Sequence, residues 1–383
     1  MPIESRNGHV QRVMIDMTRL RCLHCGLGQF SLHLGRALAR APKSAISPEF
    51  LLPFRNRRLL AKLGLPGMGA YPWMKERYQQ SYRPWIRGLL PPVPRYALWH
   101  ATTQYTRFLP LDERVPLLLT IHDLNFLREK PPSAWERNLR RVQNVIDRAQ
   151  AVTTISNFVA KEIRNYLDLR GKPLRVIYNG LIAEDYPDAK RPPFVDGGPF
   201  LFAIGDISPK KNFHVLIHLL GPLQQYRLII AGNDRTPYAA QIRRYAAEAG
   251  VAGRVVLPGV VNDATRYWLY KNCTAFLFPS LTEGFGLPVI EAMQFGKPVF
   301  LSAATSLPEV AGPMAFYFRS FEPEPMVRVF CEGMAAYAAA ANYPARLIAR
   351  ARHFSWDKAA AEYLVQYDEI LEGTQGRYRR AVA

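Results

Sequence analysis

The sequence predicts an α/β protein built from two doubly wound parallel sheets. Short apolar runs alternate with longer segments of helical period through most of the 383 residues, which is the pattern of βαβ units. The apolar runs are too many for one sheet. Residues 185–198 read DYPDAKRPPFVDGG, which is rich in Pro, Gly and charge and has no periodicity, as expected of a linker. We therefore expect one sheet domain in residues 1–188 and a second in 189–355.

Each apolar run gives one expected strand, and each amphipathic segment gives one expected helix. The expected strands are 12–15, 97–100, 117–121, 151–154 and 175–178 in the first domain, and 199–204, 226–231, 254–257, 274–278 and 298–301 in the second. The expected helices are 29–40, 135–148, 158–167, 212–220, 238–249 and 287–295. A further amphipathic helix, 356–371, opens a C-terminal segment, 356–383. Residues 51–96 fit neither pattern, and we interpret them as a basic, aromatic excursion containing one or two short helices.

The composition limits the class of protein. With 49% hydrophobic and 21% charged residues the chain is globular, and four cysteines are too few for a disulfide scaffold. The formal net charge is +19, and residues 1–200 hold 31 Lys and Arg against 16 Asp and Glu. Such a charge suits nucleic acid, an anionic membrane or anionic small molecules as partners. We see no signal peptide and no apolar run of about 20 residues, so we expect a cytosolic protein.

The strongest local motif is PSLTEGFGLPVIEA at residues 279–292. It follows an expected strand and opens an expected helix. Gly284 and Gly286 let the backbone approach a ligand closely, and a helix N-terminus favours phosphate. The carboxylates of Glu283 and Glu291 are suited to accept hydrogen bonds from sugar hydroxyls beside such a phosphate site. Alternatively, Glu283 caps the helix and Glu291 is a solvated side chain.

A basic turn, GDISPKKN at residues 205–212, lies between another expected strand and helix. A lysine pair at such a turn can neutralise a pyrophosphate, because each ammonium acts as a compact point charge. Lys210 and Lys211 are therefore candidate ligands of a diphosphate. The alternative is a solvated turn that happens to contain two lysines.

Two weaker signals lie in the first half. Gly28 belongs to a G-x-G in the turn before the first expected helix, although any tight βα turn can use glycine there. His122 follows the expected strand 117–121, at the end of a parallel strand where open α/β sheets bind ligands. A packed histidine without a functional role is an equally good interpretation of His122 alone.

The cysteines give no clear site. Cys22 and Cys25 form a C-x-x-C, but a zinc or redox role needs further partners, and Cys273 and Cys331 lie far away without a paired spacing. The chain also has no D-x-D, the simplest motif that binds a metal–diphosphate complex. We therefore expect neither a metal site nor a redox function.

Taken together, these motifs resemble the retaining glycosyltransferases of family 4, which have the GT-B fold. The resemblance rests on GLGQ at 26–29, HD at 122–123, TISNFVAKEI at 154–163, IYNG at 177–180, GDISPKKN, EGFGLPVIEA and FSWDKAAAEY at 354–363. The spacing from Glu283 to Glu291 matches the E-x7-E motif of these enzymes. The resemblance implies two Rossmann-like domains facing one another across a cleft, with the donor held mainly by the second domain and the final helix crossing back to the first.

The resemblance also implies a role for each motif residue. Glu283, His122 and Lys211 would be catalytic, with Lys211 neutralising the diphosphate and His122 lying near the transferred sugar. The residues implied in donor binding are Gly28, Gly205, Lys210, Lys211, Gly284, Phe285, Gly286, Leu287 and Glu291, of which Glu291 would bind the ribose hydroxyls. One position departs from the family: many members carry Arg where this chain has Asp206, so Asp206 is expected to turn away or Lys210 to supply the missing charge.

The implied activity is retaining transfer of a sugar from a nucleotide sugar to a lipid-linked or lipopolysaccharide glycan. Mannose or a related hexose or deoxyhexose is expected, with a GDP-linked donor favoured over a UDP-linked one and no metal required. The alternatives are another GT-B enzyme, such as a sugar-nucleotide epimerase or a phosphorylase, and a basic nucleic-acid-binding protein. Basic side chains between Arg55 and Arg87, interleaved with Trp and Tyr, suit an anionic membrane surface. We therefore expect a peripheral protein on the inner face of the cytoplasmic membrane that does not bind nucleic acid.

Overall fold

The computed structural model describes residues 10–23, 25–42, 45–52, 96–106, 108–110, 112–182 and 185–382. The chain forms two compact units, which divide at Gly180 and Phe354. Unit 1 contains the chain up to Gly180 together with the segment from Ser355 onward, and unit 2 contains Leu181–Phe354. Most of the expected basic excursion, residues 53–95, lies outside the described residues.

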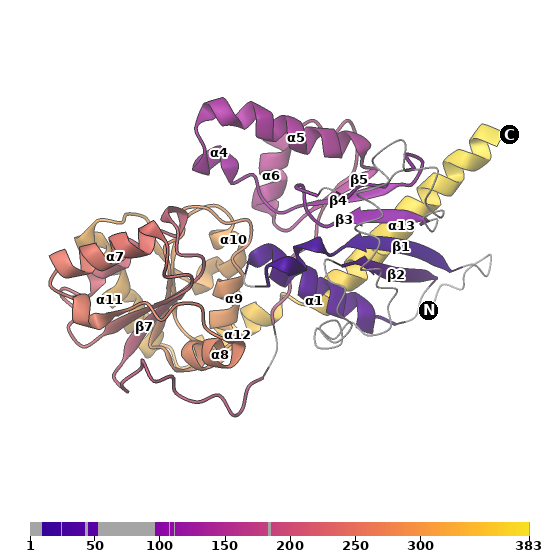
Figure 1. The fold of residues 1–383 in the computed structure, drawn as a ribbon. Coiled ribbons are helices and arrows are strands. Elements are labelled where there is room, and N and C mark those ends of the chain that lie inside the picture. The colour runs from indigo at the N-terminus through magenta and orange to yellow at the C-terminus, as the bar shows by residue number, and fades with distance from the viewer. Residues whose placement is uncertain are drawn as a thin grey trace. The chain divides into compact units, whose positions relative to one another are not determined.

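Unit 1 is an α/β unit around a parallel sheet (Figure 1). Its six described strands lie in the order β2-β1-β3-β4-β5-β6, and every neighbouring pair is parallel. The strands are β1 (Gln11–Asp16), β2 (Ile46–Leu51), β3 (Leu98–Ala101), β4 (Leu117–Ile121), β5 (Ala151–Thr154) and β6 (Leu174–Val176). The helices are η1 (Thr18–Arg21), α1 (Gly26–Arg40), α4 (Phe126–Glu129), η3 (Pro132–Ala134), α5 (Trp135–Arg148), α6 (Asn157–Tyr166) and α13 (Trp356–Val382), of which η1 and η3 are 3-10 turns.

Alternate strand residues of unit 1 face different helices, as the pleat of a strand requires. Leu117 and Leu119 of β4 belong to the core under α5 and α6. His100 of β3 and Thr120 of β4 face the other way and form hydrogen bonds with Tyr367 and Tyr363 of α13. The final helix therefore packs on unit 1 although the chain reaches it from unit 2.

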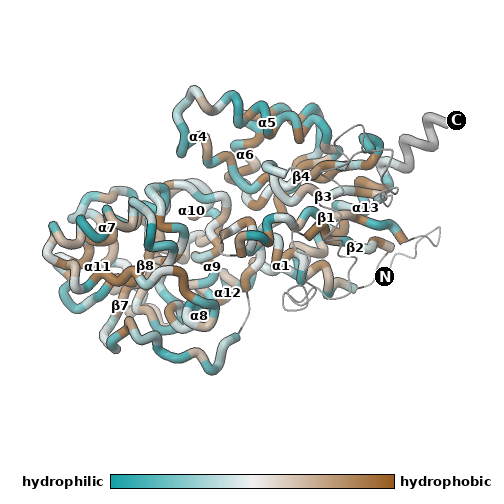
Figure 2. The backbone as a smooth tube through the Cα atoms, viewed as in Figure 1, coloured by the Kyte–Doolittle hydropathy of each residue, from teal (hydrophilic) through white to brown (hydrophobic). Residues whose placement is uncertain are grey.

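Unit 2 repeats the plan with a second parallel sheet, in the order β12-β11-β10-β7-β8-β9. Its strands are β7 (Phe200–Ile204), β8 (Arg227–Ala231), β9 (Val255–Val256), β10 (Ala275–Phe278), β11 (Val299–Ser302) and β12 (Phe316–Phe318). Its helices are η4 (Pro209–Lys211), η5 (Phe213–Leu219), α7 (Pro237–Glu248), η6 (Ala252–Arg254), α8 (Asp263–Asn272), α9 (Leu287–Met293), α10 (Leu307–Ala311), η7 (Gly312–Met314), α11 (Pro323–Ala339) and α12 (Tyr343–Arg352). Figure 2 shows the apolar central strands that form the core of each unit.

All ten expected strands are present, with ends shifted by at most two residues, and the structure adds two more, β2 and β12. Both lie at a sheet edge. The apolar run of β2 is interrupted by Ser47, Pro48 and Glu49, and β12 has only three residues, of which two are partly buried. In β2 Pro48 is tolerated because an edge strand has one side without ladder hydrogen bonds. The expected helix 212–220 is a 3-10 helix, η5, preceded by Asn212 in the left-handed conformation with φ 56°.

Candidate functional site

The motif loops of unit 2 meet where the strand order of its sheet reverses. The basic turn follows β7 and the glycine-rich loop follows β10, and these two strands are neighbours. The chain leaves β7 towards β8 on one side and arrives at β10 on the other, so a crevice opens at their carboxyl ends, where open α/β sheets bind ligands. Two glycines permit close packing there, since a Cβ on Gly232 would lie 2.0 Å from the carbonyl oxygen of Gly205.

Lys211 and Glu283 form a buried ion pair at this position. The Lys211 ammonium donates a hydrogen bond to Oε1 of Glu283 and lies 4.8 Å from the centre of the Phe278 ring. The two side chains are only 11% and 14% exposed. The interpretation of Lys211 as a solvated turn residue is therefore wrong. Lys210 is half-buried and Asp206 is exposed, so the acid stands towards solvent.

Hydroxyl groups fix the position of Glu283. Ser280 donates to the same carboxylate oxygen at 2.6 Å, and the Glu283 amide donates to the Thr305 hydroxyl at 3.0 Å. Ser306 donates to the Glu283 carbonyl at 3.0 Å. Glu283 does not cap α9, whose N-cap residue is Gly286 without a side-chain capping bond. The carboxylate instead orients the Lys211 ammonium.

The loop residues between Glu283 and α9 present backbone to the crevice and side chains to the core. Phe285 is buried and its ring meets Phe354 edge-on at 5.3 Å. Gly286 has φ 103°, and a Cβ there would lie 2.7 Å from Leu307, so glycine is required for both reasons. Leu287 is buried at the first position of α9. Main-chain groups are thus what this loop can offer to a ligand.

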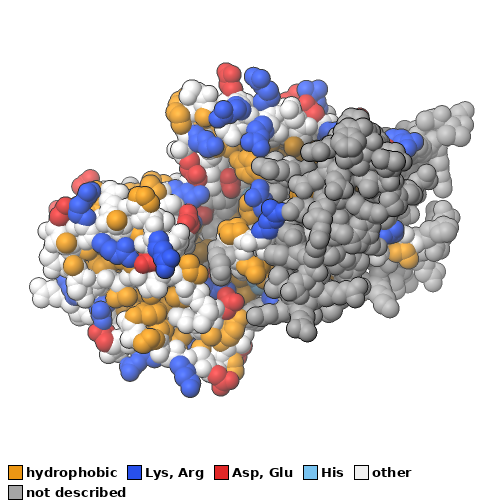
Figure 3. Space-filling model, in the orientation of Figure 1, with side chains coloured by type: hydrophobic (Ala, Val, Ile, Leu, Met, Phe, Trp, Pro, Cys, Tyr) orange, Lys and Arg blue, Asp and Glu red, His pale blue; other side chains and the backbone are white. Residues whose placement is uncertain are grey.

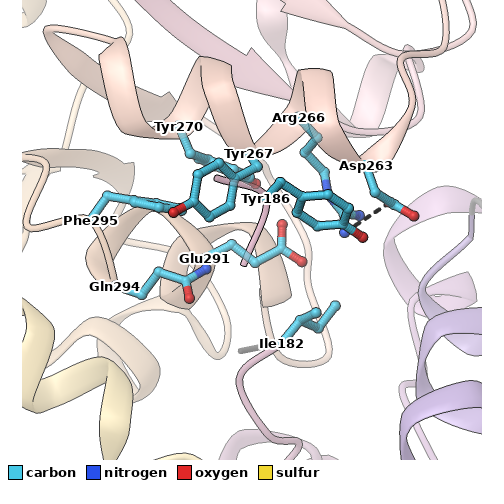
Figure 4. Close-up of a pocket in the computed structure, with 9 residues that line it drawn as sticks. All are labelled: Ile182, Tyr186, Asp263, Arg266, Tyr267, Tyr270, Glu291, Gln294 and Phe295. Atoms are coloured by element: carbon cyan, nitrogen blue, oxygen red, sulfur yellow. Dashed lines mark ion pairs between the residues drawn. The ribbon is translucent and has the colours of Figure 1, made fainter. Parts of the chain in front are cut away.

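Glu291 lines a small open pocket in unit 2 (Figure 4). The side chain comes from α9 and is only 6% exposed, so the interpretation as a solvated residue is wrong. The pocket has about 270 Å³ of empty space, part of it open to solvent. Its lining consists of Glu291, charged and aromatic side chains of α8, and neighbours from two other segments: Ile182, Tyr186, Asp263, Arg266, Tyr267, Tyr270, Gln294 and Phe295.

The electrostatics of this pocket are set by one glutamate and one arginine. Arg266 of α8 forms an ion pair with Asp263 at 3.1 Å, drawn dashed in Figure 4. The charge of Glu291 is the main cause that raises the pKa of Arg266 above its usual value. Burial, and then the same carboxylate, raises the pKa of Tyr270 well above its usual range. Asp263, Arg266 and Tyr270 were not singled out from the sequence; their only signal is their position on the helix that follows β9.

In unit 1, Gly28 lies in the first turn of α1 against the backbone of the preceding turn. A Cβ at this position would lie 1.8 Å from the carbonyl oxygen of Cys22, so no other residue fits without moving the main chain. Gly28 and the carboxyl ends of β1 and β3 lie where the strand order of this sheet reverses. The contact with the Cys22 carbonyl is sufficient to require glycine here, and a role of Gly28 in donor binding stays a prediction.

His122 is buried directly after β4 and is held by hydrogen bonds on two sides. Its Nε2 lies 2.7 Å from the Thr102 carbonyl oxygen, and its main-chain amide donates to Gln104 at 3.2 Å. A carbonyl oxygen can only accept, so Nε2 carries the proton. Burial lowers the pKa of His122 to about 4, and the ring packs edge-on against Phe30. His122 is thus a neutral imidazole whose Nδ1 is an acceptor.

Unit 1 is expected to lose stability when the pH falls below about 6.5. Burial lowers the pKa of His100 to about 3 and of His122 to about 4, against 6.5 for an exposed histidine. The unfolded chain therefore binds protons that the native chain does not, and the free energy of unfolding falls as pH drops from 6.5 towards 4. From pH 7 to pH 5 the loss is about 2 kcal/mol per histidine.

Urea unfolding followed by circular dichroism at pH 7 and pH 5 measures this loss. His100→Gln removes one of the buried histidines, so the variant should lose about 2 kcal/mol less than the wild type between the two pH values. Asp16, whose pKa is raised by burial, acts in the opposite direction, because its native form binds a proton more readily than the unfolded one. A His100→Gln variant with the wild-type pH dependence would contradict the assignment to His100.

The predicted site residues thus fall into two groups. Lys211, Glu283 and the loop up to Leu287 are assembled in unit 2, where Glu291 lines the pocket. Gly28 and His122 belong to unit 1. Within the described ranges there is no group of three or more His, Cys, Asp or Glu side chains that could hold a metal ion. None of the helices in those ranges combines the length and hydropathy of a membrane span.

Two family models match the chain one after the other and together span most of it. Residues 25–185 match the family described as Glycosyltransferase Family 4, and residues 187–353 match Glycosyl transferases group 1. The chain belongs to glycosyltransferase family 4. The matched ranges meet at residue 186, close to the division between the two units at Gly180.

Curated relatives of this family-4 chain include bacterial mannosyltransferases. It is 29% identical over 291 residues to the serotype-specific mannosyltransferase WbdA of Escherichia coli, a match that covers 71% of this chain and 36% of WbdA. It is 27% identical over 267 residues to the O-antigen chain mannosyltransferase B of Escherichia coli, covering 65% and 69%. The chain thus spans about a third of the length of WbdA.

Solved structures with the same fold cover almost the entire chain. The sucrose-phosphate synthase of Thermosynechococcus elongatus superposes with a TM-score of 0.69 at 18% identity, covering 95% of this chain and 100% of the other. HepE of Anabaena in complex with UDP-glucose superposes with a TM-score of 0.69 at 19% identity, covering 94% and 100%. At these identities the likeness concerns the fold, and the fold is GT-B.

Proposed function

We propose that this chain transfers a sugar from a nucleoside diphosphate sugar to a hydroxyl of a glycan, with retention of configuration. The observation that carries the proposal is the buried Lys211–Glu283 pair beside the glycine-rich loop of unit 2. Departure of a nucleoside diphosphate develops negative charge on the leaving phosphate, and a fixed ammonium stabilises that charge where water is excluded. Lys211 has three N–H donors and uses one on Glu283, so it can bind a phosphate oxygen without leaving the glutamate. We propose that the step needs no divalent metal.

The pocket next to this loop is proposed to bind the nucleoside. Glu291 lies close enough to Arg266 to raise the pKa of that arginine, and the Glu291 side chain can accept hydrogen bonds from the two vicinal hydroxyls of a ribose. Tyr186 and Tyr267 add aromatic surface in the same pocket, and their rings lie 5.8 Å apart. These groups support a ribonucleoside diphosphate as the leaving group.

The base is proposed to be guanine. Asp263 lines the same pocket, and the contact of one carboxylate oxygen with Arg266 orients the carboxylate. That oxygen keeps a second lone pair, so both oxygens can accept from a ligand. Guanine carries N1–H and N2–H donors side by side, which a carboxylate can bind together, whereas uracil offers a single N3–H between two carbonyl groups. The mannosyltransferase names of several relatives support mannose, or a related sugar, as the transferred group.

A panel of nucleoside diphosphates tests this assignment. We expect GDP to bind more tightly than UDP, and Asp263→Asn to weaken GDP by about tenfold or more while leaving UDP unchanged, because one hydrogen bond to a charged group is lost. Glu248→Gln is the charge control, since it also removes an acid that faces an arginine. Tighter binding of UDP than of GDP in calorimetry would contradict the guanine assignment. Transfer from the preferred nucleotide sugar, measured with EDTA present, tests the proposed step itself.

His122 is proposed to bind a hydroxyl of the transferred sugar. Its Nε2–H is occupied by the Thr102 carbonyl, so the imidazole can offer Nδ1 as an acceptor. A neutral ring accepts a sugar hydroxyl without donating a proton to the reaction. This role agrees with the low pKa of His122, because protonation would destroy the acceptor.

The acceptor is proposed to be a lipid-linked or lipopolysaccharide glycan at the cytoplasmic face of the membrane. The names of three relatives refer to O-antigen chains. Figure 3 shows Lys and Arg side chains gathered over α4 and α5 of unit 1, where Arg137, Arg140 and Arg141 are exposed. Together with the basic residues between Arg55 and Arg87, which lie outside the described residues, they support docking on anionic lipid.

Sedimentation with anionic vesicles tests the docking. Neutralising the basic residues between Arg55 and Arg87 is expected to release the chain from phosphatidylglycerol vesicles, with a loss of about 1 kcal/mol of binding free energy per charge near the surface. The wild-type chain on neutral phosphatidylcholine vesicles is the control. Unchanged binding to anionic vesicles after neutralisation would contradict this docking surface.

A further inference from the structure

The cysteine pair before α1 forms a tight turn that the sequence does not reveal. The Cys25 amide donates a hydrogen bond to the Cys22 carbonyl at 3.2 Å, and a bond between residues i+3 and i is typical of a β-turn. Such turns bring their first and last Cα atoms within about 7 Å. A disulfide needs Cα atoms about 4.4 to 6.8 Å apart. The backbone of this turn is therefore already close to the geometry that a Cys22–Cys25 disulfide requires.

The two thiols differ in access in the way that a stepwise oxidation needs. Cys22 is exposed, whereas Cys25 is half-buried and its thiol donates to the Cys22 carbonyl at 3.0 Å. Burial is the main cause that raises the pKa of Cys25, so Cys25 stays a thiol while Cys22 meets an oxidant from solvent. The turn is also held in place from α1, because the Gln29 side chain donates to the Leu23 carbonyl at 2.5 Å.

We propose that Cys22 and Cys25 are a reversible oxidation site that closes to a disulfide. A hydroperoxide transfers one oxygen to the Cys22 thiolate, giving a sulfenic acid and the corresponding alcohol, or water from hydrogen peroxide. The Cys25 thiol then loses its proton and attacks the Cys22 sulfur, which forms the S–S bond and releases water. A dithiol reductant donates two electrons and two protons and restores both thiols.

Closure of the disulfide should reach Gly28 through the main chain. The Cys22 carbonyl accepts from both the amide and the thiol of Cys25, and its oxygen lies where a Cβ on Gly28 would be. Formation of the disulfide removes the hydrogen bond from the Cys25 thiol to the Cys22 carbonyl. The backbone between the two cysteines then has to adjust, although the Cys22 carbonyl is already packed against Gly28. The expected loss of sugar transfer on oxidation rests on the proposed function and on the donor-binding role that the family resemblance implies for Gly28, whereas the disulfide itself does not.

Peptide mass mapping of the full-length chain tests the site. Trypsin releases Cys22–Arg36 as one peptide that holds both cysteines and no other. In a Cys331→Ser background, which removes the exposed cysteine of unit 2, treatment with hydrogen peroxide is expected to lower the mass of this peptide by two hydrogen atoms. Dithiothreitol should restore the mass. Cys22→Ser and Cys25→Ser should both abolish the change.

Initial rates of sugar transfer, measured on the same samples, show whether formation of the disulfide also changes the activity. We expect oxidation to lower the rate at least tenfold, dithiothreitol to restore it, and both serine variants to resist oxidation. If the peptide keeps both thiols, or gains oxygen without losing two hydrogen atoms, the proposed Cys22–Cys25 disulfide is wrong. A disulfide that forms without any change in rate overturns its control over transfer. If no nucleotide sugar is turned over even in the reduced chain, the proposed function fails, while the peptide mass still decides the disulfide.

Discussion

Lys211→Met is expected to lower the turnover number for sugar transfer by a factor of about 10² to 10³, the usual effect of removing one group that stabilises developing negative charge. The ammonium of Lys211 is in place before a donor binds, because Glu283 and the Phe278 ring hold it. Methionine keeps the unbranched apolar stem and removes the charge. Initial rates at saturating donor measure the effect, which should appear in the turnover number more than in KM because the charge develops in the transition state.

The same variant is expected to be less stable by about 2 to 4 kcal/mol in the free energy of unfolding, since it leaves the Glu283 carboxylate buried without its cation. Adding Glu283→Gln removes that unpaired charge. The double variant should therefore regain much of the stability without regaining activity. Lys210→Met, in the same turn but outside the ion pair with Glu283, is the matched control, with wild-type stability and a smaller loss of rate. A folded Lys211→Met enzyme with a rate within a few-fold of wild type would remove Lys211 from the proposed site.

Gly28→Ala is expected to be the least tolerated addition of a methyl group among the described glycines of unit 1. The new Cβ would lie 1.8 Å from the Cys22 carbonyl oxygen and 2.7 Å from its carbon, and both atoms belong to the main chain. The loss in the free energy of unfolding should be about 3 kcal/mol, at the upper end for overpacked sites. Transfer should fall about 10²-fold in kcat/KM, because the family resemblance implies that Gly28 binds the donor, and a displacement of the order of 1 Å in a substrate-positioning segment has that effect.

Gly26→Ala provides the control for this variant within the same helix. Gly26 is the first residue of α1, and a Cβ there meets nothing within 4 Å. Alanine at this position should be neutral or stabilise the chain by about 0.5 to 1 kcal/mol, since it restricts the unfolded state. Thermal unfolding and initial rates of the two alanine variants form the comparison. Equal stability and equal rates for both would contradict the packing argument at Gly28.

The fold was largely predictable because central strands of a parallel sheet are buried on both faces and appear as uninterrupted apolar runs. Strands β4 and β5 match their expected ranges at both ends for this reason. The edge strand β2 contains Ser47, Pro48 and Glu49, and no such run exists there. Strand β2 is fixed by its pairing with β1, which lies about 35 residues earlier in the chain. The local periodicity of the sequence gives no information about such a pairing.

The site was predictable where local backbone requirements leave a sequence motif. Gly286 and Lys211 were found from turn chemistry, and the structure explains both. Thr305 and Arg266 were not found, because neither belongs to a motif and each reaches its partner through the packing of separate elements. The two carboxylates of the E-x7-E spacing also have different surroundings, an ammonium for Glu283 and a guanidinium for Glu291, which spacing alone does not distinguish.

The division of unit 1 into two stretches of sequence sets an order for folding during synthesis. Unit 2 is continuous from Leu181 to Phe354, so its core can close as soon as that stretch has left the ribosome. The hydrogen bond of the His100 imidazole forms later, because its partner Tyr367 is translated after the whole of unit 2. Until then His100 of β3 and Thr120 of β4 lack their hydrogen-bond partners, the hydroxyl groups of Tyr367 and Tyr363. The first unit to be translated is therefore the last to be completed.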